Sequence, residues 1–81
     1  MTYTIPFSVE ERPQHCLIEL LDLSQQQTIA EIYRQECNPG THAVEFDPSQ
    51  VQGGLEAGVY ILRITIGDES ESYPFRYMPS D

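Results

Sequence analysis

The sequence predicts an all-β domain: a small sandwich of two packed sheets with six or seven mainly antiparallel strands. Apolar residues alternate with polar ones over five segments, and turn-forming residues separate these segments. A period of two is typical of a strand that buries one face. With 81 residues, the chain has room for one thin core, so we assign residues 1–81 to a single domain.

In each alternating segment, one set of residues is expected to face the core. These sets are Tyr3, Ile5, Phe7 and Val9; Cys16, Ile18 and Leu20; His42, Val44 and Phe46; Tyr60, Leu62, Ile64 and Ile66; and Tyr73, Phe75 and Tyr77. Pro6 and Pro74 predict that the first and last strands lie at sheet edges, because proline cannot donate to a strand ladder.

The connections follow from turn chemistry. Asn38-Pro39-Gly40 predicts a tight turn, and residues 67–70 (GDES) can close a hairpin. Residues 47–57 lack alternation, which indicates a long connection with a short helical turn after Pro48. Residues 24–35 are compatible with a short helix, but their helical spacing lasts barely two turns. We therefore expect a turn followed by a strand with a bulge.

Charge restricts the partners. Thirteen acidic residues oppose four arginines, without any lysine, giving a formal net charge of −9. This sign repels nucleic acid and anionic membranes. The N-terminus lacks the pattern of a signal peptide, and no apolar run reaches transmembrane length. We expect no nucleic-acid partner, no membrane insertion and synthesis in the cytoplasm with reduced thiols. A final place in an extracellular or particle assembly stays open.

Several segments in their observed order carry a family resemblance: IPFSV at 5–9, CLIELLDLS at 16–24, PGTHAVEFD at 39–47, GGL at 53–55 and AGVYILRI at 57–64. This order resembles the immunoglobulin-like module of the flagellar hook-capping protein family. It is also similar to the C-terminal sorting domains of type IX secretion cargo. The resemblance implies a small immunoglobulin-like β-sandwich and a structural role for His42.

An outward apolar patch is the candidate interface. By register, five apolar residues should face away from the core: Leu17, Leu21, Val59, Ile61 and Met78. Scattered exposed apolar residues are ordinary, whereas a contiguous patch marks a protein interface. The alternative is a bulge that reverses the register of one strand.

No group of residues predicts catalysis or a cofactor. His42 is interpreted as a packed histidine with a hydrogen-bond partner. The remaining zinc-ligand types, His15, Cys16 and Cys37, lack the close pairs of a structural site, so no metal is predicted. A Cys16–Cys37 disulfide is expected only in an exported protein. The acidic hairpins, Glu10-Glu11 and residues 68–71, are interpreted as solvated turn charges.

These observations favour a non-catalytic assembly module over an enzyme. Its partners would be protein subunits, either its own copies in a homo-oligomer or another protein, within a filament, an appendage cap, or a phage-like or injection-type particle. One alternative is a secretion or sorting module of a longer exported protein. A carbohydrate-binding domain ranks lower; its candidate aromatic residues are Tyr3, Tyr33, Tyr73 and Tyr77.

Overall fold

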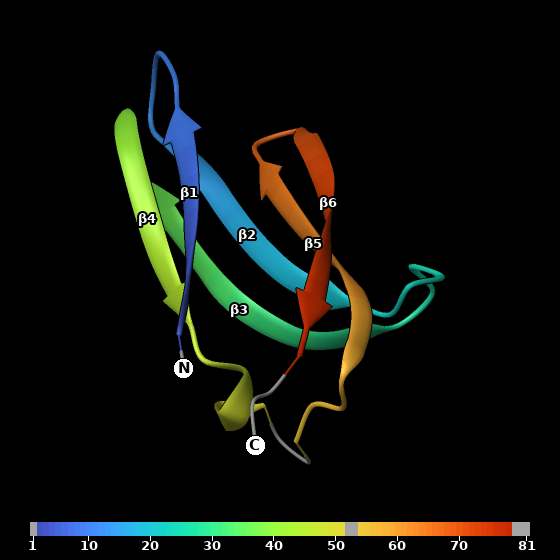
Figure 1. Ribbon diagram of the computed structural model, residues 1–81. Coiled ribbons are helices and arrows are strands. Elements are labelled where there is room, and N and C mark those ends of the chain that lie inside the picture. Colours follow the sequence, from blue (N-terminus) through green and yellow to red (C-terminus); the bar gives the residue numbers. More distant parts are fainter. Residues whose placement is uncertain (1, 52–53, 79–81) are drawn as a thin grey trace.

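Six strands form two antiparallel sheets in the computed structural model, which describes residues 2–51 and 54–78 (Figure 1). The strands are β1 (Tyr3–Val9), β2 (Gln14–Leu21), β3 (Thr28–Cys37), β4 (Gly40–Phe46), β5 (Gly58–Ile66) and β6 (Glu69–Tyr77), with a 3-10 turn, η1 (Pro48–Gln50). One sheet pairs β1 with β4; the other has the order β3-β2-β5-β6. The predicted all-β sandwich is confirmed.

The core lies between the sheets, where the alternating residues face one another. It contains Ile5, Phe7, Val9, Cys16, Ile18, Leu20, Cys37, Phe46 and Ile64. Aromatic contacts join the sheets at one end, because the Phe75 ring of β6 lies 4.9 Å from Tyr3 and 5.9 Å from Phe46, centroid to centroid. The predicted inward positions of β1 and β2 are therefore correct.

The ambiguous segment 24–35 is mainly strand, as expected, and it is irregular. The β2–β3 register shifts between Ile18 and Glu19 and again between Leu20 and Leu21. Each shift leaves one β3 residue without a direct partner: Ile32 at the first and Ile29 at the second. Both isoleucines pack against the core, so the bulges let β3 bury more apolar side chains than strict alternation would.

Two aspartates organise the loops. Asp22 Oδ1 accepts hydrogen bonds from the backbone N–H groups of Gln26 (3.0 Å) and Gln27 (3.1 Å). Asp47 Oδ1 accepts one from Ser49 N–H (3.0 Å) at the start of η1. Tyr60 donates its hydroxyl hydrogen to the Glu56 carbonyl across 2.5 Å. Turn carboxylates typically accept such backbone N–H groups, and a tyrosine near the start of a strand typically donates to an upstream carbonyl.

The pairing pattern matches the immunoglobulin arrangement, in which strands A, B, E and D form one sheet and C, F and G the other, with C′ beside C in variable-type domains. β1 and β4 take positions B and E, β2 and β3 take C and C′, and β5 and β6 take F and G. The described residues fill neither position A nor position D. Among the described strands, β1 and β4 therefore each have one unpaired edge.

Candidate protein interface

The outer face of the four-stranded sheet consists of cross-strand rows. In the first row, Leu17 of β2 lies opposite Thr65 of β5. In the next, Glu19 lies opposite Arg63, and Arg63 Nη2 donates to Glu19 Oε1 across 2.8 Å. The ion pair thus occupies the two central strands of this face and interrupts its apolar surface.

Beyond the ion pair, most residues of the outer face are apolar, although Arg76 lies opposite Val59. Leu21 lies opposite Ile61, and Ile61 lies opposite Pro74 of β6. Val59 follows one row further along β5 and is 44% exposed. Met78, directly after β6, is 58% exposed. We call Val59, Ile61, Pro74 and Met78 the outer patch.

The five residues predicted for the interface therefore do not form one continuous surface. Leu17 is separated from the others by the Glu19–Arg63 row. Leu21 is only 2% exposed, because it sits between Thr28 and Ile61 where the β2–β3 register shifts; its predicted exposure is wrong. Val59, Ile61 and Met78 remain at one end of the outer face, where Pro74 joins them.

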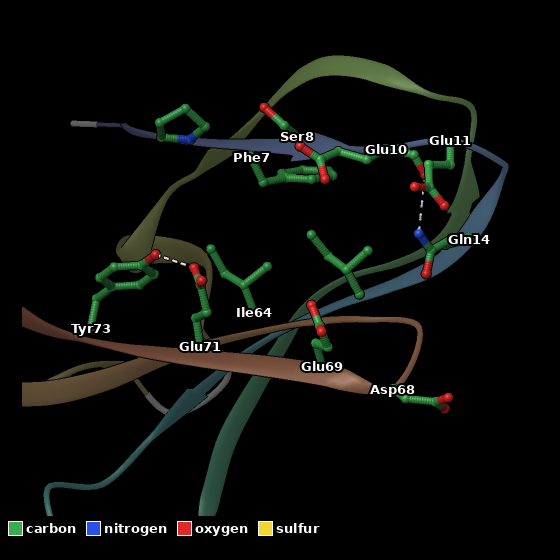
Figure 2. A pocket seen from close by; sticks show the side chains of 12 residues that line it. Phe7, Ser8, Glu10, Glu11, Gln14, Ile64, Asp68, Glu69, Glu71 and Tyr73 are labelled. Atoms are coloured by element: carbon green, nitrogen blue, oxygen red, sulfur yellow. Dashed lines mark hydrogen bonds between the residues drawn. The ribbon is translucent and has the colours of Figure 1, made fainter.

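A second surface, which the sequence analysis missed, is a groove of about 590 Å³ between β1 and β6 (Figure 2). It is lined by Pro6, Phe7, Ser8, Glu10, Glu11, Gln14, Ile64, Ile66, Asp68, Glu69, Glu71 and Tyr73. The acidic hairpins interpreted as separate solvated turns meet at this groove. The sequence offered one indication: Glu10 directly follows the first strand and Asp68 directly precedes the last, and these two strands border the groove.

Tyr73 shows that this side of the sandwich is open. Its register opposite Leu62 places it on the inner face of β6, yet it is 46% exposed. Its hydroxyl donates to Glu71 (Figure 2), and this hydrogen bond raises the pKa of Tyr73 above its ordinary value. The two-stranded sheet therefore covers the inner face of the four-stranded sheet incompletely.

The other candidate aromatic residues do not form a platform for sugars. Tyr3 packs edge-on against Phe75, and Tyr33 contacts Cys37 Sγ through its hydroxyl at 3.2 Å. Tyr77 is half-buried. Only Tyr73 is exposed among these four residues, so the structure offers a single ring rather than a stacking surface.

The histidine and cysteine residues have structural surroundings. His42 is half-buried, stacks on Phe7 at 5.2 Å, and has Nε2 2.6 Å from the Asn38 carbonyl oxygen. Cys16 and Cys37 are buried free thiols. Burial, followed by a hydrogen bond to Cys37, raises the pKa of Cys16 to about 11. Within residues 2–51 and 54–78, no three His, Cys, Asp or Glu side chains are grouped to hold a metal ion.

Comparisons with protein-family models, curated proteins and solved structures return no match. In the part of the chain that the structure describes, no helix is long and apolar enough to cross a membrane.

Proposed function

We propose that this protein is a non-catalytic assembly module that binds a protein subunit through the outer patch. The observation that carries this proposal is the grouping of Val59, Ile61, Pro74 and Met78 at one end of the outer face. Apolar side chains that gather at an accessible surface favour burial against another protein. The resemblance to the hook-capping module supports the same class of function.

The geometry suggests how the patch binds. β5 and β6 supply a rigid, hydrogen-bonded platform, with Ile61 directly opposite Pro74 and Val59 opposite Arg76. Arg76 lies between Pro74 and Met78 along this face, so a partner would also meet one positive charge within the patch. On this proposal the subunit partner contacts the two strands together, and Ile61 lies near the centre of the contact.

The test is Ile61→Asp, which places a charge in the patch, compared with Ser72→Asp on the same outer face opposite Arg63. Sedimentation velocity over a wide concentration range measures self-association. Quantitative capture from a native lysate measures binding to other proteins. We expect Ile61→Asp to abolish either self-association or binding to another protein, and Ser72→Asp to leave self-association and binding unchanged. If neither measurement responds to Ile61→Asp in a folded protein, the outer patch is not the interface.

A further inference from the structure

The groove between β1 and β6 borders a free strand edge. β1 pairs with β4 along its whole length, from Tyr3 to Val9, and no described strand pairs with its other edge. Alternate backbone groups of β1 therefore lie at this edge without a described strand partner, and Pro6 at the middle of β1 contributes no N–H. An unpaired edge is a template for an added strand. At roughly 3.3 Å per residue, the seven residues offer an edge of about 23 Å.

The groove is also the place of a strand that the immunoglobulin arrangement contains. Position A pairs with position B, which β1 occupies, and the only side of β1 open to such pairing borders the groove. The inner-face residues there are covered incompletely: Ile66 is half-buried and Tyr73 is 46% exposed. A strand in this position would cover both residues and extend the β1–β4 sheet to three strands.

The charge of the groove selects the occupant. Five carboxylate residues line it, namely Glu10, Glu11, Asp68, Glu69 and Glu71, without an arginine among the lining residues. Glu69 and Glu71 lie opposite Ile66 and Ile64, so they share the inner face with the apolar floor. An inserted segment must therefore present apolar and basic side chains on the same face.

A second copy of this chain fits poorly. Its net charge is −9 and it contains no lysine, so its own strands would be repelled by the groove. We infer that the groove accepts an extended, cationic segment of a different protein, which pairs with β1 as an added strand.

This surface is distinct from the outer patch, so the two proposals can fail independently. The probe is the blocked peptide KTVTKTVTK, which reads identically in both directions and can place every Val and Lys toward the groove. Amide chemical shifts of the isotope-labelled protein locate binding. We expect saturable shifts at Thr4 and Ser8 on β1 and at Glu69 and Glu71 on β6. Absence of binding at millimolar peptide would overturn the proposal, as would shifts confined to β3 or β4.

Two matched peptides separate strand addition from general attraction to an acidic protein. One is N-methylated at the four threonines, and the other at the two valines and the central lysine. Both keep the full charge. Only one set of N–H groups can face β1. We expect one peptide to lose affinity about tenfold and the other to bind within roughly twofold of the parent. Equal affinities would show that no strand is added.

A pair of protein variants tests the charges. Glu69→Gln with Glu71→Gln should weaken binding of the parent peptide about tenfold. The control, Glu31→Gln with Glu36→Gln, makes the same change of net charge at exposed positions on β3 and should have little effect. Ile61→Asp should leave peptide binding unchanged. Similar losses for the two double variants would indicate attraction by net charge alone and would overturn the proposed site.

Discussion

Arg63 of β5 contacts the same carboxylate oxygen of Glu19 on β2 twice, through Nη2 at 2.8 Å and Nε at 3.3 Å. The residues are direct cross-strand neighbours on the outer face. The Glu19 side chain is 14% exposed and the Arg63 side chain 34% exposed. The pair is therefore less screened by water than an ordinary surface ion pair, and it joins the two central strands where the apolar surface is interrupted.

This geometry predicts measurable coupling between Glu19 and Arg63. In a double-mutant cycle with Glu19→Gln and Arg63→Gln, we expect a coupling free energy of about 0.5–1 kcal/mol, near the upper end for solvent-accessible pairs. Urea unfolding provides the values. The more exposed Glu31–Arg34 pair on β3 is the control and should couple less strongly. Coupling no larger than that of the control pair would contradict the structural role given to Glu19.

Asp22 predicts a pH dependence of stability. Hydrogen bonds from the Ser24 hydroxyl (2.8 Å), and then from the N–H groups of Gln27, Gln26 and Gln25, lower the pKa of Asp22 below its ordinary value of 3.8. A carboxyl whose pKa is depressed in the folded state stabilises the protein above its unfolded pKa. This contribution is lost as the pH falls through the folded pKa.

The measurement compares the wild type with Asp22→Asn between about pH 7 and pH 2.5. The stability difference between them should shrink as the pH falls below about 3.8. Ser24→Ala removes the hydrogen bond that contributes most to the lowered pKa of Asp22. In that variant, the Asp22 carboxyl should titrate closer to its ordinary pKa. If the wild type and Asp22→Asn differ by the same amount at every pH, Asp22 does not contribute through its ionised form.

The limits of sequence reasoning appear at particular residues. Alternation correctly placed Ile5, Cys16 and Ile18 in the core, because a two-residue period depends only on local backbone geometry. It misplaced Leu21, whose burial depends on the β2–β3 register shift. Alternation correctly assigned Tyr73 to the inner face of its strand, but it did not show that the two-stranded sheet leaves this part of the face uncovered. Strand pairing and the coverage of one sheet by another depend on contacts between residues far apart in the sequence, so the local alternation of apolar residues cannot predict them.

The conformation of Gly67 in the β5–β6 turn predicts that replacing this residue lowers the stability of the protein. This residue has φ of 61°, and its N–H donates to the His15 carbonyl at 2.9 Å. Gly67→Ala should destabilise the protein by about 1–2 kcal/mol, because a β-carbon disfavours the left-handed region. Gly67→Asn should cost less, since asparagine tolerates this region better. Thermal or urea unfolding of both variants gives the comparison.

A steric explanation at Gly67 can be separated from the conformational one. A β-carbon there would lie 2.2 Å from Oε1 of Gln14, which is the end of a flexible side chain and can move. Adding Gln14→Ala to Gly67→Ala should therefore recover little of the lost stability. Full recovery would show that the clash, rather than the positive φ, determines the cost.

Cys16 predicts thiol chemistry that is suppressed by the fold. The side chain is fully buried, and burial is the largest cause of its pKa of about 11, followed by the hydrogen bond to Cys37. Because the thiolate is the reactive species, a rise of the pKa from 9.0 to about 11 leaves on the order of a hundredfold less thiolate at pH 8.

Iodoacetamide should label Cys16 slowly in the folded protein and rapidly in guanidinium, as followed by peptide mass spectrometry. Cys37→Ser should leave Cys16 protected, because burial is the principal cause. Native labelling as fast as labelling of the unfolded chain would mean that β2 opens readily, and with it the centre of the core.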